Sequence, residues 1–132
     1  MSQRQAIFDY AAHRYGVTPE YLWQKFPSYA VLRHHQAKGK WFALIGHIER
    51  AKLGLDGGGS TDFLNVKCTP EMVGVMRQEP NVLPAYHMNK THWNSVLCEG
   101  LKSDLIKKMI DHSYDLILNS LTKKKREEVL NA

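Results

Sequence analysis

Residues 62–71 read Asp-Phe-Leu-Asn-Val-Lys-Cys-Thr-Pro-Glu, and the two halves of this stretch indicate different kinds of structure. Apolar and polar side chains alternate along residues 62–68, as they do in a β-strand whose two faces meet different surroundings. One face would carry Leu64, Val66 and Cys68, and the other Phe63, Asn65 and Lys67. The first half therefore predicts a strand with an apolar face toward the core.

The second half, Thr69-Pro70-Glu71, is typical of the beginning of a helix. Thr supplies an N-cap, Pro fixes φ at the first helical position, and Glu places an acid in the first turn. We predict a short helix over residues 70–78, with Met72, Val75 and Met76 facing inward as core residues. A strand that leads directly into a helix is one part of a mixed fold.

The same criteria predict the other elements of the chain. They are a helix over 2–15 ended by Gly16, a short helix from Thr18-Pro19-Glu20 to Pro27, strands over 29–35 and 41–48 joined by residues 36–40, a flexible turn within 50–61, a loop over 82–89, a strand over 93–99, and a helix over 103–121. The last helix would bury Ile106, Met109, Ile110, Ile117 and Leu121. This order favours an α+β fold with two layers, in which helices pack on one face of an antiparallel sheet of about four or more strands.

Length and composition limit the class of protein. The chain has 132 residues, which is enough for one domain with its own core, so we predict a single domain over 1–132 with a charged tail at 122–132. Its two cysteines exclude a disulfide scaffold and have no CxxC partner for zinc. The sequence lacks a run of apolar residues long enough for a signal peptide or a membrane span, so we predict a cytoplasmic protein. The net charge of +5 permits an anionic partner without requiring one.

The densest group of polar residues that could bind a ligand or take part in catalysis lies in residues 84–93. Its members are His87, Asn89, Lys90, His92 and Trp93. Two histidines without further ligands disfavour a metal site, and no nucleophile signature accompanies them. Lysine and protonated histidine could bind phosphate, while tryptophan could stack on a base. Alternatively, Asn89 caps a turn, the histidines bond to backbone carbonyls, and Trp93 covers the edge of the core.

Further candidate residues lie on the predicted strands and on the last helix. Lys67 would share the sheet face away from the helices with Phe63, Asn65, Trp93 and Ser95, either as a basic and aromatic binding surface or as a solvated face. Arg33, His34 and His35 would add positive charge on the first strand, most simply on a solvent-exposed face. On the last helix, Asp111 and Asp115 would pair with Lys107 and Lys108. The basic run 123–126 is best explained as a solvated helix end.

Several of these motifs together resemble the MmcQ/YjbR family of small bacterial proteins. The likeness rests on His87-Met88-Asn89-Lys90-x-His92-Trp93 and on Asp111-His112-Ser113-Tyr114-Asp115-Leu116. It is extended by Trp41-Phe42-Ala43-Leu44, Arg50-x-Lys52-Leu53-Gly54-Leu55 and Asn65-Val66-Lys67-Cys68-x-Pro70, and covers about residues 21–126. The resemblance implies a frataxin/CyaY-like α+β fold, also called a double wing, and a DNA-binding role.

From these observations we predict a non-catalytic protein that binds DNA weakly through phosphate contacts. The predicted contact residues are Lys67, His87, Asn89, Lys90, His92 and Trp93. The alternative is a module that binds a protein or a small anionic ligand without a DNA function, and the third possibility is an enzyme. We predict no cofactor, no metal ion and no membrane partner.

Overall fold

The computed structural model describes residues 3–34 and 39–130 and has an α+β fold, as predicted. Five strands form one sheet in the order β1-β2-β3-β5-β4, and every neighbouring pair is antiparallel. The strands are β1 (Ala30–Arg33), β2 (Trp41–Glu49), β3 (Ser60–Lys67), β4 (Val82–Pro84) and β5 (Trp93–Leu97), and the α-helices are α1 (Gln3–Tyr15), α2 (Pro70–Met76), α3 (Ser103–Ser120) and α4 (Lys123–Leu130). Short 3-10 helices span Arg50–Leu53 and Cys98–Gly100. None of the helices in the described residues is long and apolar enough to cross a membrane.

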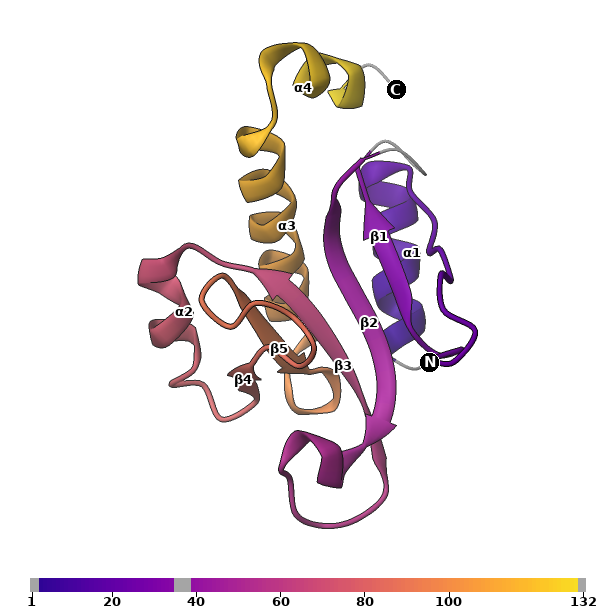
Figure 1. Cartoon of the computed structure of the whole chain (residues 1–132), viewed down its shortest axis with the longest axis vertical. Helices are drawn as coiled ribbons and strands as arrows, with labels where there is room; N and C mark the ends of the chain where they lie inside the picture. The colour runs from indigo at the N-terminus through magenta and orange to yellow at the C-terminus, as the bar shows by residue number, and fades with distance from the viewer. Residues whose placement is uncertain (1–2, 35–38, 131–132) are drawn as a thin grey trace.

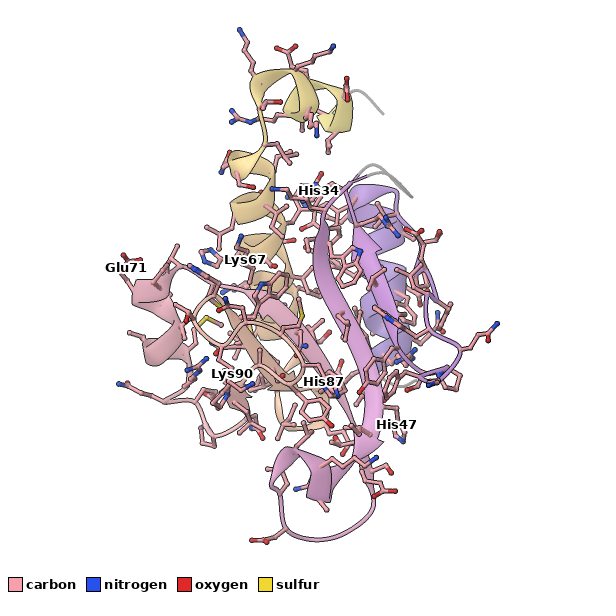
Figure 2. The ribbon with its side chains drawn as sticks, in the orientation of Figure 1. His34, His47, Lys67, Glu71, His87 and Lys90 are labelled. Atoms are coloured by element: carbon pink, nitrogen blue, oxygen red, sulfur yellow. The ribbon has the colours of Figure 1, made fainter. Side chains whose placement is uncertain are left out.

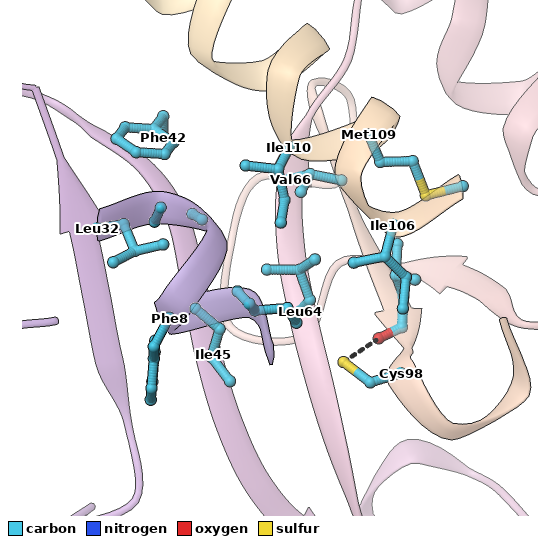
Figure 3. Close-up of a cluster of buried hydrophobic side chains, with 14 of the residues drawn as sticks. Phe8, Leu32, Phe42, Ile45, Leu64, Val66, Cys98, Ile106, Met109 and Ile110 are labelled. Atoms are coloured by element: carbon cyan, nitrogen blue, oxygen red, sulfur yellow. Dashed lines mark hydrogen bonds between the residues drawn. The ribbon is translucent and has the colours of Figure 1, made fainter. Parts of the chain in front are cut away.

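Helices α1 and α3 cover one face of the sheet and form the main core with it (Figure 1). Leu64 and Val66 of β3 lie there against Ile106 and Ile110 of α3, as Figure 3 shows. The alternation predicted for this strand is therefore confirmed, as is most of the buried stripe predicted on α3. Helix α4 follows α3, buries none of its residues and projects away from the sheet (Figure 1).

A serine of α3 interrupts the sheet at one end. Strands β2 and β3 are paired as far as Ala43 and Val66. In a continuous antiparallel ladder the next bond would join the Lys67 N–H to the Phe42 carbonyl. Instead, the Ser113 hydroxyl lies between these groups: it accepts from the Lys67 N–H at 2.8 Å and donates to the Phe42 carbonyl at 2.6 Å. The buried hydroxyl thus satisfies both backbone groups while the two strands part.

The sheet face away from α1 and α3 is covered, which corrects one prediction. We expected Phe63, Asn65 and Ser95 to project from an open face, yet all three are fully buried. A second hydrophobic cluster lies on this side, formed by Tyr29, Val31, Leu44 and Phe63 with Trp23, Trp41, Ile48, Leu53, Tyr86 and Met88 packed against them. The chain after β4 crosses this face in Figure 1. Loops rather than helices therefore build its cover.

The predicted short helix at 18–27 is wrong. Glu20 instead forms an isolated antiparallel bridge with Val31, with backbone bonds of 3.0 and 2.9 Å. Its carboxylate also lies 2.9 Å from the Arg33 guanidinium. Pairing with the edge of β1 satisfies the backbone groups that a helix would have bonded internally, so tertiary contacts override the local helix-start signal.

Two differences concern the chain around α2. The predicted loop 82–89 begins with a short strand, β4, at the edge of the sheet, where a proline at its last position costs no ladder bond. In α2 the expected inward residues Met72 and Val75 are 41% and 54% exposed, whereas Val73 is buried. The face of α2 that packs against the protein therefore contains Val73, and not Met72 and Val75 as we predicted.

His34 is fully buried, contrary to the solvent-exposed position predicted for it. Its ring lies 4.1 Å from the Tyr114 ring and 5.1 Å from the Phe42 ring, centre to centre. Desolvation in this aromatic cluster lowers the His34 pKa from 6.5 to about 4, so the side chain is neutral and adds no positive charge at pH 7. His35 lies outside the described residues.

Asp111 has other partners than the lysines predicted for it. Its carboxylate accepts hydrogen bonds from the Tyr10 hydroxyl, at 2.7 and 2.8 Å, and from the Tyr15 hydroxyl. Burial and the neighbouring carboxylate raise the pKa of both tyrosines. Asp111 therefore joins α1 to α3.

Candidate functional site

A cleft of about 350 Å³ lies at the end of the sheet where Ser113 separates β2 from β3. It is lined by Gly39, Lys40, Trp41, Lys67, Met88, Trp93 and Ile117. Two of the predicted contact residues, Lys67 and Trp93, belong to this lining. Figure 2 shows Lys67 beside α3 in this part of the molecule.

The antiparallel topology brings the polar and aromatic residues of the cleft together. Trp41 begins β2, Lys67 ends β3, and Trp93 begins β5. Lys67 and Trp93 are direct partners in the register of β3 and β5. Because antiparallel neighbours place the start of one strand beside the end of the next, residues far apart in the sequence meet at one edge.

The two indoles of the cleft are supported from opposite faces of the sheet. Trp41 meets Trp23 edge to face, with ring centres 5.4 Å apart, as part of the loop-covered cluster. Trp93 is half-buried and packs against the helix-covered core. These neighbours restrict the orientation of each ring.

Buried polar groups hold the loop that forms one side of the cleft. The Asn65 amide donates to the Tyr86 carbonyl at 2.9 Å, and the Tyr86 N–H donates to the Ser95 hydroxyl at 2.8 Å. Ser95 in turn donates to the Asn65 side-chain oxygen. These residues of β3 and β5, which we predicted as part of an open surface, instead fix the position of the loop that contains Met88.

Arg77, which follows α2, fixes the other end of this loop. Its guanidinium donates to the Asn94 side-chain oxygen at 2.7 Å, to the Trp93 carbonyl at 3.3 Å and to the Lys90 carbonyl. An arginine after a short helix carries no local signal that its partners lie in a distant loop, so sequence reasoning missed this role. Lys40 and Trp41 were likewise missed, because a hairpin end and a strand start are ordinary places for them.

The other predicted contact residues do not line the cleft. His87 has a φ of 62° and places its ring 3.9 Å from that of Tyr86 and 6.2 Å from that of Phe26. Asn89 accepts from the Thr91 N–H at 2.7 Å through its side chain, which is the turn-capping role weighed as an alternative. The Lys90 side chain is exposed, and the carbonyl of half-buried His92 accepts from the Cys68 N–H at 2.7 Å. In Figure 2, His87 and Lys90 lie apart from Lys67.

The sequence of this chain matches that of a known protein family over most of its length. The sequence model of the family described as YjbR matches residues 13–116, which is most of the chain. The chain belongs to the YjbR family. The resemblance predicted from the motifs is thereby confirmed for the family and for its α+β fold.

Relatives with this fold occur in several bacteria. The YjbR-family chain is 44% identical over 117 residues to the Bacillus subtilis protein YyaQ, with 88% of this chain and 98% of the relative covered. A crystal structure from Pseudomonas syringae superposes with a TM-score of 0.82 at 42% identity, covering 86% of this chain and 97% of that one. A Deinococcus radiodurans protein shares the fold, with a TM-score of 0.75 at 22% identity over 98% of this chain and 88% of that one.

Proposed function

We propose that this protein is a non-catalytic binding module whose cleft receives a nucleotide unit, with the phosphate at the lysines and the base against an indole. The observation that carries the proposal is the lining itself, in which Lys40 and Lys67 lie together with Trp41 and Trp93. Ammonium groups bind phosphate as point charges, and tryptophan offers a face on which any base can stack. These two kinds of group match the two parts of a nucleotide.

This proposal narrows the DNA-binding role predicted from the sequence. A base inside a duplex is stacked and paired, so its face cannot reach an indole unless the duplex opens at a cost of a few kcal/mol. A free nucleotide and a nucleotide of single-stranded DNA present the same chemistry without that cost. We therefore expect weak binding without sequence specificity, at ~10⁻⁴–10⁻⁶ M in physiological salt, with single-stranded DNA preferred over duplex.

We also propose that this binding takes place in the cytoplasm. Cys68 and Cys98 are both buried and unpaired. Free buried thiols are compatible with a reducing compartment, where nucleotides and nucleic acid are present.

Tryptophan fluorescence offers a direct test, because two of the three tryptophans line the cleft. The protein would be titrated with adenosine monophosphate, inorganic phosphate, a short oligothymidylate and a duplex of equal length. A Trp23→Phe background removes the tryptophan that does not line the cleft while keeping an aromatic partner for Trp41. We expect strong quenching by the mononucleotide and the single strand, and little by inorganic phosphate, which has no ring to stack.

Lysine variants locate the binding surface. Lys67→Ala and Lys40→Ala should each weaken binding and lower the magnitude of the log–log salt slope for the single-stranded oligonucleotide by about 0.7 per lost phosphate contact. Lys90→Ala is the matched control, because this exposed lysine lies outside the cleft lining. A loss at Lys90→Ala equal to that at Lys67→Ala, or tighter binding to the duplex, would refute the cleft as the site.

A further inference from the structure

A second hollow, unrelated to the cleft, lies between α2 and α3 and has a volume of about 240 Å³. It is lined by Met72, Met76, Leu105, Lys108, Met109 and His112. Met72 and Met76 are one turn apart on α2, and Met109 and His112 are nearly one turn apart on α3. Residues at these spacings share a helix face, so the two helices present two side chains each to the same space.

The potential ligands of this groove differ in how far they are exposed to solvent. Met72 is 41% exposed and His112 is exposed, whereas Met76 is half-buried and Met109 is only 8% exposed. The buried Cys68 thiol, which does not line the groove, lies 3.3 Å from the Met76 sulfur. Met109 belongs to the main core and Met76 packs against it, whereas Met72 is exposed, so the expectation that the methionines of α2 only fill the core does not explain Met72.

From this cluster we infer a site for a soft monovalent metal ion, Cu(I), held by the thioethers of Met72, Met76 and Met109 and the imidazole of His112. Thioether and imidazole are ligands that suit Cu(I), whereas hard divalent ions prefer oxygen. Our prediction of no metal rested on two histidines without further ligands and on cysteines without a CxxC partner, and it assigned the methionines of α2 to the core. The groove lining contains no carboxylate among the described residues.

The charge of the groove favours a monovalent ion. Thioethers and neutral imidazole bring no negative charge to the complex, so the ion keeps its full charge. The Lys108 ammonium at the groove repels a divalent ion about twice as strongly as a monovalent one at the same distance. Selectivity for Cu(I) over Zn(II) follows from both the ligand type and this ammonium.

The backbone around the groove is fixed, while the ligands themselves can adjust. The Thr69 hydroxyl caps α2 by accepting from the Met72 N–H at 3.3 Å. The buried Asn94 amide donates to the Val73 carbonyl at 3.3 Å and so ties α2 to β5. Methionine has three rotatable bonds, which lets its sulfur move onto an ion without a shift of either helix.

NMR of the full chain labelled with ¹³C at the methionine methyl groups tests the site in solution. Ag(I) serves as the redox-stable probe, and Cu(I) is added anaerobically in competition with a chromophoric chelator. At one equivalent of either ion, we expect the methyl signals of Met72, Met76 and Met109 to shift together. Met88, which lines the other cleft, provides an internal control and should not move. Zn(II) should leave all of these signals in place.

Variants distinguish the thioether cluster from a single thiol. Met72→Leu and His112→Gln should each lower Ag(I) affinity at least about ten-fold, and Met88→Leu should leave it unchanged. Cys68→Ser should retain the methionine shifts. Unshifted methionine signals in the wild-type protein, or binding that is lost in Cys68→Ser but kept in both Met72→Leu and His112→Gln, would overturn the inference.

Discussion

The two faces of the sheet are covered in different ways. Helices α1 and α3 cover one face, where the buried hydrophobic cluster is mostly aliphatic and the buried Ser113 hydroxyl of α3 bonds to the sheet backbone at one end. Loops cover the other face, where an aromatic cluster is accompanied by the buried polar side chains of Asn65 and Ser95. Helices satisfy their own backbone groups, whereas loops do not, so a face covered by loops needs polar side chains to receive them. The candidate cleft opens where these two covers meet.

Phe63→Ala tests whether the loop-covered face is a true core. Phe63 is fully buried and its ring lies 5.6 Å from Tyr29 and 5.9 Å from Tyr86. We expect a loss of about 3–5 kcal/mol in the free energy of unfolding, measured by urea denaturation. Ile110→Ala, in the helix-covered core, is the reference, with an expected loss of about 2–5 kcal/mol. A loss below about 1 kcal/mol for Phe63→Ala would show that the loops cover this face only loosely.

His34 lies next to the helix-covered core, with its ring among those of Tyr114 and Phe42. Because its pKa is about 4 in the folded state and 6.5 in its ordinary state, the unfolded chain binds more protons between these values. Stability should therefore fall as pH is lowered from 6.5 to 4, by up to about 3 kcal/mol from this residue, with no further loss below that window. Urea denaturation at a series of pH values measures this loss.

His34→Phe is the matched variant, because it keeps an aromatic ring against Tyr114 and removes the titrating group. Its stability should depend less on pH over the same window. If the wild-type and variant curves run parallel from pH 7 to 4, the imidazole is not responsible for the acid sensitivity.

Asn65→Ala should produce a smaller and more local effect. The change leaves the Tyr86 carbonyl without its side-chain donor on the loop-covered face, at a cost of about 1–3 kcal/mol. Amide hydrogen exchange should accelerate at Tyr86, whose N–H bonds to Ser95, more than at Ile110 in α3. Equal acceleration at both amides would mean that the two faces unfold as one unit.

The smallest effect is expected for Lys67→Ala. Lys67 shares a strand with Phe63 and Asn65, but its side chain is only half-buried at the cleft. The free energy of unfolding should stay within about 0.5 kcal/mol of the parent, because the bond between its N–H and Ser113 is made by the backbone. A large loss of stability would assign this lysine to the fold and would complicate its use as a binding probe.

Local signals in the sequence predicted most of the fold correctly. The alternation in residues 62–68 indicated which side of β3 faces the core, and Thr69-Pro70-Glu71 marked the start of α2. The same kind of signal failed at Thr18-Pro19-Glu20, where pairing of Glu20 with Val31 decided the conformation. Local chemistry thus predicts an element only where no stronger distant partner competes for the same backbone groups.

Prediction of the candidate site was less complete. Lys67 and Trp93 line the cleft as two members of the predicted set, and their role as contact residues stays a prediction. The structure adds Trp41 at the start of β2 and Lys40 just before it, together with Ser113, whose hydroxyl lies between β2 and β3. Nothing local distinguishes these residues, since each acquires its position from strand order and from the packing of α3.

The sequence by itself determined the family through its motifs. It also determined the α+β class and the inward parity of β3, because capping residues and side-chain alternation act over only a few neighbouring positions. Only the tertiary structure decided that loops bury the second face, that His34 lies among aromatic rings, and that lysines and tryptophans from separate strands share one cleft. These features depend on contacts between segments distant in the chain. Such contacts form only when the whole sheet and its two covers pack together.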